Sequence, residues 1–246
     1  MLRSADRVDS APKSFGLSLQ NVYETLAISV PTVLDALRGR VTKDLSDRRL
    51  DRWARNIVRN ARIELDIVGR ENLVAGETFL VMSNHQSLYD IPVLFQVAGP
   101  NIRMITKQEL FKVPIFGNAL EAGGFISIDR SNRHAAIRSL EKARALLASG
   151  THVWIAPEGT RSRTGELLPF KKGAFYLALE ALLPILPVTL QGTRDALEAK
   201  GLRSRSGARV RVTIHPKIDP TPFAARGKRG RDELMKHLRE VLGSAL

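Results

Sequence analysis

The sequence predicts an α/β domain, a central and mostly parallel sheet of about seven strands flanked by helices. Short apolar runs of strand character alternate along the chain with segments of helical spacing, which is typical of a sheet with helices on its faces. Residues 79–83 are apolar up to a final serine, as expected for a central strand buried on both faces. A chain of 246 residues can bury such a core without disulfides, and this one has no cysteine.

The N-terminal region differs from the rest of the chain. Residues 1–16 mix charges with small polar residues and predict a disordered lead-in. Over residues 19–37 the apolar side chains recur at helical spacing, and Pro31 is expected to kink this helix. No run of about eighteen apolar residues is present, so the length rule predicts no membrane-spanning helix.

A second helix is expected to start with Ser46 or Asp47 as its cap and to run through Asn60. One face is apolar, at Leu50, Trp53, Ala54, Ile57 and Ala61. The other carries arginines, at Arg48, Arg52, Arg55, Arg59 and Arg62. This pattern fits a helix lying on an anionic bilayer, or an ordinary helix packed on its own domain. We predict that residues 17–62 form a two-helix membrane-associating extension and residues 63–246 the α/β domain.

The remaining elements follow in order. Further strands are expected at residues 63–67, 102–105, 125–128, 152–156, 185–190 and 210–214. A helix capped by Ser131 or Asn132 should end at Gly150, and others should cover residues 173–183 and the C-terminal stretch around Leu234 and Leu238. Residues 194–231 are basic and rich in loop formers. The net charge of +13 makes an anionic membrane, a nucleic acid, or a phosphorylated or CoA-like substrate candidate partners.

The sequence Asn84-His85 follows the strand at residues 79–83, and Asp90 comes five residues after the histidine. Open α/β sheets keep their sites at the carboxyl ends of strands, and Asp90 at a helix start can fold back towards His85. A histidine held by a carboxylate is a candidate general base for a hydroxyl. The alternative is a helix-start aspartate beside an unrelated histidine.

A second polar stretch, Glu158-Gly159-Thr160-Arg161, follows another strand. Glycine allows backbone N–H groups to approach an anion, and arginine offers a two-pronged donor for phosphate. Glu158 could hold Arg161 or accept a hydrogen bond from a substrate hydroxyl. The alternative is a solvated surface turn.

Two further cations, Arg130 and Lys107, also follow strands and could converge on the same crevice.

Taken together, these stretches resemble the 1-acyl-sn-glycerol-3-phosphate acyltransferases of the glycerolipid acyltransferase superfamily. Four blocks match the family in order, at residues 84–90, 124–130, 157–162 and 184–188, and the resemblance covers residues 67–193. The residue before Pro157 is usually a large aromatic in this family, whereas here it is Ala156. The shape of the nearby pocket therefore stays open.

The resemblance implies that His85 is the base and that Asp90 fixes and polarises it. It implies that the acceptor's phosphate is held by the third-block loop with Lys107 and Arg130. The predicted substrate-binding residues are Asn84, Lys107, Arg130, Glu158, Gly159, Thr160 and Arg161. Pro187 and Val188 are expected on the acyl-donor side.

The implied reaction moves an acyl group from acyl-CoA or acyl carrier protein to the sn-2 hydroxyl of lysophosphatidic acid. No cofactor or metal is expected. The anionic cytoplasmic face of the cell membrane is the expected location, with peripheral or monotopic attachment.

Three rival interpretations are open. A related acyltransferase could use glycerol-3-phosphate, another lysophospholipid or a lyso-aminolipid. A basic nucleic-acid-binding protein would explain the charge, but no nucleic-acid motif is present. A metal hydrolase built on His85, Asp90, His152 and Glu158 lacks a recognised ligand spacing.

Overall fold

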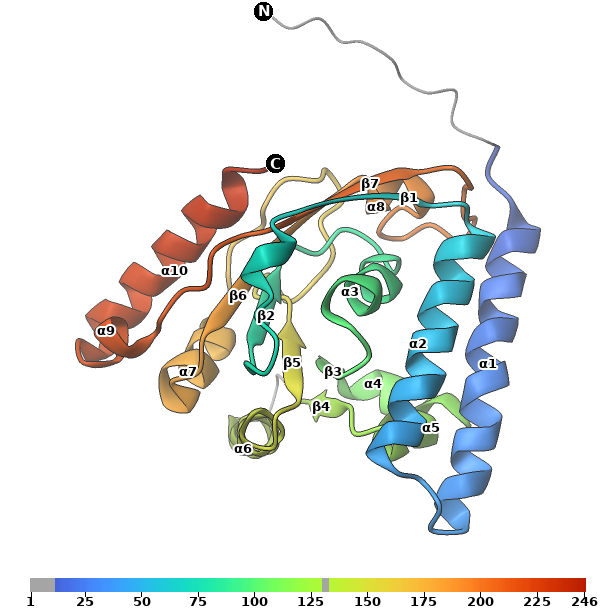
Figure 1. Ribbon diagram of the computed structural model, residues 1–246, viewed down its shortest axis with the longest axis horizontal. Coiled ribbons are helices and arrows are strands. Elements are labelled where there is room, and N and C mark those ends of the chain that lie inside the picture. Colours follow the sequence, from blue (N-terminus) through green and yellow to red (C-terminus); the bar gives the residue numbers. More distant parts are fainter. Residues whose placement is uncertain (1–11, 130–132) are drawn as a thin grey trace, which may run out of the picture.

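The structure is a computed structural model that describes residues 12–129 and 133–246 (Figure 1). Over these residues the chain forms a seven-stranded sheet with the strand order β1-β7-β6-β2-β5-β3-β4. The strands are β1 (Glu64–Val68), β2 (Leu80–Ser83), β3 (Ile102–Lys107), β4 (Ile126–Ile128), β5 (His152–Ile155), β6 (Ile185–Gln191) and β7 (Arg209–Ile214). β6 and β7 pair antiparallel and the other neighbours pair parallel. The predicted fold class is confirmed.

Helices connect and cover these strands. The longer ones are α1 (Phe15–Leu37), α2 (Lys43–Asn60), α3 (Asp90–Ala98), α6 (Arg133–Ala148), α7 (Lys172–Ala181) and α10 (Gly227–Gly243). The shorter ones are η1 (Arg70–Asn72), α4 (Gln108–Phe111), α5 (Phe116–Ala122), α8 (Thr193–Ala196) and α9 (Thr221–Ala224). The sequence did not predict this second group, because helices of three to seven residues are too short to show a hydrophobic period.

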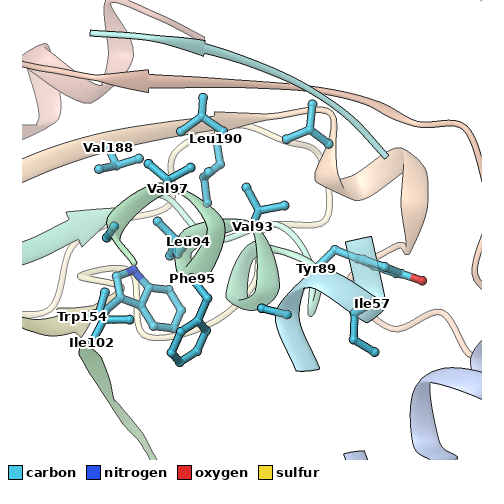
Figure 2. Packing of buried hydrophobic residues seen from close by; sticks show 14 of the residues in the cluster. Ile57, Tyr89, Val93, Leu94, Phe95, Val97, Ile102, Trp154, Val188 and Leu190 are labelled. Atoms are coloured by element: carbon cyan, nitrogen blue, oxygen red, sulfur yellow. The ribbon is translucent and has the colours of Figure 1, made fainter. Parts of the chain in front are cut away.

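The sheet separates two hydrophobic cores, with α1, α2 and α3 on one face and α6, α7 and α10 on the other (Figure 1). Neighbouring residues of β2 divide between them: Val81 belongs to the first core, and Leu80 and Met82 to the second. This alternation explains why a strand in the middle of the sheet is apolar on both sides. In Figure 2, Val93 and Val97 of α3 lie towards Val188 and Leu190 of β6.

The starts of the first two helices differ from the prediction. α1 begins at Phe15, because the Ser14 hydroxyl accepts a hydrogen bond from the N–H of Leu17. The helix therefore includes the last two residues of the predicted lead-in of residues 1–16, and residues 1–11 lie outside the described ranges. α2 is capped by Thr42, whose hydroxyl accepts from the N–H of Leu45, and not by Ser46 or Asp47.

Asp47 makes a tertiary contact instead of a cap. Its carboxylate accepts a hydrogen bond from the buried guanidinium of Arg103 on β3, at 2.7 Å. Arg103 also donates to the carbonyl oxygens of Gly123, Pro100 and Ile102. This network ties α2 to the sheet.

The apolar face of α2 is buried within the protein. Leu50, Ala54, Ile57 and Ala61 belong to the core beside α3, and Trp53 packs edge-on against Phe95. Of the two interpretations of this helix, packing on its own domain is therefore correct. The boundaries predicted at residues 16/17 and 62/63 stay predictions.

α1 has the opposite orientation, with polar residues inward and apolar residues outward. Its inward face carries Ser18, Asn21, Thr25, Ser29 and Thr32, spaced three or four residues apart. The hydroxyls of Thr25, Ser29 and Thr32 donate to carbonyls one turn earlier in the helix. The outward face exposes Phe15, Leu19, Val22, Tyr23, Leu26, Val30, Leu34 and Leu37. The helix continues through Pro31.

The C-terminal limit of α6 agrees with the sequence, since Gly150 follows the helix with a positive φ of 82°. Its predicted caps, Ser131 and Asn132, lie outside the described residues. Among the described helices, none is long and apolar enough to cross a membrane.

Candidate active site

The candidate site lies where β2, β5 and β6 end, in the middle of the sheet. β2 runs directly into Asn84 and His85, and the β5 strand leads to Glu158. Because these strands are parallel neighbours, their carboxyl ends meet at one edge of the sheet. The predicted convergence of the first and third sequence blocks is present.

His85 and Asp90 form a close pair. Nδ1 of His85 lies 2.6 Å from Oδ2 of Asp90, and the same oxygen accepts the N–H groups of Gln86 at 2.7 Å and Ser87 at 2.9 Å. Asp90 is completely buried, whereas the His85 side chain is 16% exposed. This geometry suits the tautomer with the proton on Nδ1, which would donate to the Asp90 carboxylate and leave the Nε2 lone pair free.

Glu158 anchors the third-block loop to the histidine. Its Oε1 accepts the N–H of His85 and its Oε2 accepts the N–H of Leu168, each at 2.8 Å. The N–H of Ser162 in turn donates to the His85 carbonyl at 2.7 Å. Burial raises the pKa of Glu158, while the two backbone N–H groups oppose this shift. Both oxygens bind the backbone, so the carboxylate shapes the site.

Arg161 lies one residue before this contact and is partly buried. Burial lowers the pKa of its guanidinium, and the negative charge of Asp90 acts in the opposite direction. Gly159 has a φ of 71°, which a side chain would disfavour, and Thr160 is exposed beside it. These three residues form a turn that carries one arginine and is tied to the His85 carbonyl through the N–H of Ser162.

The Asn84 side chain faces the sheet. Its Nδ2 donates to the carbonyl of Leu190 at 2.8 Å, and its Oδ1 accepts the N–H of Leu190 at 2.7 Å. This pair of bonds joins the end of β2 to β6.

The other predicted residues are more scattered. Lys107 is exposed at the end of β3, and Arg130 lies outside the described residues. Pro187 and Val188 are buried within β6. Their roles in substrate binding stay predictions.

Sequence reasoning missed Trp154, which contacts His85. Its indole ring lies edge-on to the His85 imidazole, with centroids 5.5 Å apart, and its Nε1 donates to the Ser83 hydroxyl at 2.9 Å. The residue is buried on β5, beside β2. A buried tryptophan on a central strand carries no sequence signal for this contact.

The sequence also missed an apolar cavity of about 580 Å³ lined mainly by α1, α2, α3 and α5. Leu88 and Tyr89, just beyond the histidine loop, lie in its wall. Asn21 of α1 donates a hydrogen bond to the Tyr89 hydroxyl there, at 2.6 Å. Burial raises the pKa of Tyr89, which keeps the phenol neutral. The sequence signal for this cavity was the helical spacing of the polar residues in α1, which line its wall.

No cluster of three or more His, Asp or Glu side chains suited to a metal ion occurs within residues 12–129 and 133–246. In the metal-hydrolase alternative, His152 would be a ligand. It instead begins β5, where Nδ1 accepts the N–H of Phe79 at 3.1 Å and the ring stacks on that residue. Burial lowers the pKa of this histidine.

Known proteins of similar sequence and fold are acyltransferases. A family model described as Acyltransferase matches residues 64–191, just over half of the chain. The 1-acyl-sn-glycerol-3-phosphate acyltransferase alpha of Mus musculus is 31% identical over 210 residues, covering 85% of this chain and 73% of the mouse protein. The chloroplastic 1-acyl-sn-glycerol-3-phosphate acyltransferase BAT2 of Brassica napus is 37% identical over 154 residues, 62% of this chain but only 44% of the plant protein.

Among solved structures, the 1-acyl-sn-glycerophosphate acyltransferase PlsC from Thermotoga maritima has the same fold. Its TM-score is 0.71 at 24% identity, and the match covers 93% of this chain and 95% of that one. The family model and the mouse relative together show that this chain belongs to the acyltransferase family.

Proposed function

We propose that this acyltransferase moves a fatty acyl group from an acyl thioester to the sn-2 hydroxyl of 1-acyl-sn-glycerol-3-phosphate, which yields phosphatidic acid. The observation that carries the proposal is the His85–Asp90 pair, whose histidine backbone is bonded to Ser162, the residue after Arg161. A base for a hydroxyl and a cationic turn for a phosphate meet in one place. The names of the relatives support the same acceptor.

In this mechanism Nε2 of His85 takes the proton of the acceptor hydroxyl while its oxygen attacks the thioester carbonyl. The tetrahedral intermediate expels the thiolate, which receives the proton from the imidazolium and leaves as a thiol. Asp90 fixes the Nδ1–H tautomer and stabilises the transient imidazolium. Both substrates occupy one site, so no covalent acyl-enzyme is required. An acyl-serine trapped by rapid quenching would argue against this direct transfer.

The acceptor's phosphate is assigned to the turn of Gly159, Thr160 and Arg161, with Lys107 and Arg130 completing the cationic surroundings. Arginine forms two parallel hydrogen bonds to phosphate oxygens, which orient the glycerol and strengthen the binding of the acceptor. Glu158 and Asn84, both bonded to backbone, are assigned to positioning and not to substrate contact.

The apolar cavity is assigned to an acyl chain. Its volume of about 580 Å³ lies in the range of small-molecule pockets, and its wall reaches Leu88, three residues after the histidine. Acyl-CoA and acyl carrier protein present the same thioester arm, so either donor fits this assignment.

Attachment to the membrane surface is assigned to α1. Its outward face exposes a row of apolar side chains that water solvates poorly, while its inward face is polar. Together with the net charge of +13, this favours peripheral binding to an anionic surface such as the cytoplasmic leaflet.

The test is acyl transfer from labelled long-chain acyl-CoA to lysophosphatidate in detergent micelles, for wild type and His85→Ala. Phosphatidate should form with wild type and be lost with the variant. Parallel reactions with acyl carrier protein as donor, and with glycerol-3-phosphate, other lysophospholipids and lyso-aminolipids as acceptors, define the substrates. A fully active His85→Ala variant would refute the mechanism.

A further inference from the structure

The connection between α4 and α5 contains a strained turn at Ile115. Its backbone has φ 66° and ψ −57°, and the N–H of Phe116 donates to the Pro114 carbonyl across it at 2.7 Å. This is a γ-turn with positive φ, which is rare and unfavourable for a β-branched residue. Strain of this kind persists only where the surroundings enforce it, and it gathers at functional positions.

Close packing at Gly117, two residues further on, enforces the turn. A Cβ atom at Gly117 would lie 2.0 Å from the Phe111 carbonyl oxygen, so this position accepts only glycine. The N–H of Gly117 donates to the Val113 carbonyl at 2.7 Å. The backbone thus folds tightly on itself at Ile115.

The strained turn presents an apolar surface to solvent. Ile115 is 41% exposed, and Leu110 and Val113 beside it are similarly exposed. We call these three residues the knuckle. Lys107 and Lys112, both exposed, lie on either side of Leu110 in the chain. Packing inside the protein does not account for three neighbouring exposed apolar side chains, one of which has a strained backbone.

The knuckle lies at the rim of the apolar cavity. Leu110 and Val113 line the cavity while remaining exposed, as do Val22 and Leu26 on the outward face of α1. α5, which follows the knuckle directly, packs against α1.

The same rim continues on another segment. Leu202, which is 81% exposed, also lines the cavity, and exposed Lys200 and Arg203 flank it. Apolar side chains bordered by cations therefore surround the cavity mouth from segments far apart in the sequence.

We infer that the knuckle is a second bilayer contact, which enters an anionic membrane surface beside α1 and holds the cavity mouth against the lipid. The inference rests on the proposed membrane-bound acyltransferase function. Apolar tips with adjacent lysines fit an anionic bilayer interface, where the tips leave water and the ammonium groups meet lipid headgroups. With α1 and the knuckle both in the surface, an acyl chain passes from bilayer to cavity without crossing water.

The test is the partitioning of the full chain to phosphatidylcholine vesicles containing about one quarter phosphatidylglycerol. Ile115→Gly removes the side chain and the strain together. Ile115→Asn replaces the apolar side chain with a polar one on a residue that tolerates positive φ. Both should bind vesicles about tenfold more weakly than wild type, since one half-inserted apolar side chain is lost. Their thermal stability should equal or exceed that of wild type.

Leu182 supplies the matched control. It also has a positive φ, of 52°, and is 49% exposed, but it follows α7 on the opposite side of the molecule from α5 (Figure 1). Leu182→Gly should raise stability and leave vesicle binding unchanged. Ile115 variants that bind like wild type, or a Leu182→Gly variant that binds as weakly as they do, would overturn the inference. An Ile115 variant that lost self-association while still binding vesicles like wild type would also overturn it.

The activity assay separates this inference from the proposed function. Ile115 lies outside the proposed catalytic and substrate-binding residues, so Ile115→Gly should acylate a short-chain, monomeric lysophosphatidate at the wild-type rate. It should slow down only when the acceptor is embedded in vesicles. If wild type acylates no lysophosphatidate, the proposed function fails, and the vesicle comparison still decides the role of the knuckle.

Discussion

Replacing Asp90 with asparagine tests the catalytic pair at a single atom. In the native protein Oδ2 accepts three hydrogen bonds, from Nδ1 of His85 and from the N–H groups of Gln86 and Ser87. Those backbone donors are fixed, so the oxygen of the new side chain must take the place of Oδ2. The new NH2 group then occupies the place of Oδ1, a buried position with no hydrogen-bond partner in the described part of the chain.

Two effects of different size follow. A buried NH2 group without an acceptor should lower the free energy of unfolding by about 1–3 kcal/mol, which leaves most domains folded. The loss of the negative charge next to Nδ1 removes the stabilisation of the imidazolium that forms during proton transfer. We expect kcat to fall by roughly 10²–10⁴-fold, the scale of general acid–base contributions.

The assay measures kcat and KM for acyl transfer, and the free energy of unfolding by urea denaturation. Asp66→Asn is the control, because Asp66 pairs with Arg211 at 3.6 Å on the exposed face of the sheet and undergoes the same chemical change. It should leave both quantities near wild type. An Asp90→Asn protein that folds and keeps kcat within about a factor of three of wild type would refute the role given to Asp90.

Three more substitutions probe the surroundings. Glu158→Gln should lower kcat more than it changes KM, because an amide cannot accept from both His85 and Leu168; an unchanged kcat would contradict the positioning role. Arg161→Lys should raise KM for the phosphate-bearing acceptor about tenfold by losing the second hydrogen bond, and equal saturation curves would speak against phosphate contact. Burial lowers the pKa of His215, so the unfolded chain binds its proton first as pH falls. Below about pH 6.5, the free energy of unfolding of wild type should therefore fall more steeply than that of His215→Gln, by up to about 1.4 kcal/mol per pH unit. The same pH dependence for both proteins, measured by urea denaturation, would refute this.

Local contacts in the site were predictable from the sequence. Asp90 reaches His85 because only a short loop and a helix start separate them, and residue spacing alone constrains that geometry. Contacts between distant segments were not predictable from the sequence. The bond from His85 to Glu158 and the clamp from Asn84 to Leu190 depend on β2 lying between β5 and β6, and strand order leaves no trace in residue spacing.

The two N-terminal helices show a second limit. α1 and α2 each have an apolar and a polar face, and the sequence pattern does not say which face meets the protein. α2 turns its apolar face inward against α3, whereas α1 turns Leu19 and Val30 outward and Thr25 and Ser29 inward. The choice is made by partners distant in the chain, such as Trp53, whose indole N–H donates to the Thr25 hydroxyl at 3.1 Å.

The same long-range bonds determine when the enzyme can become active during its synthesis. The His85 N–H finds its acceptor 73 residues later, Asn84 finds Leu190 106 residues later, and the Ser87 hydroxyl donates to a carbonyl 110 residues later. A ribosome-bound chain that already contains His85 and Asp90 therefore lacks the partners that hold their loop. Because contacts of this range form late, the catalytic loop is assembled only after β6 and the residues that follow it have emerged. A nascent chain is thus expected to be inactive until most of the protein has been made.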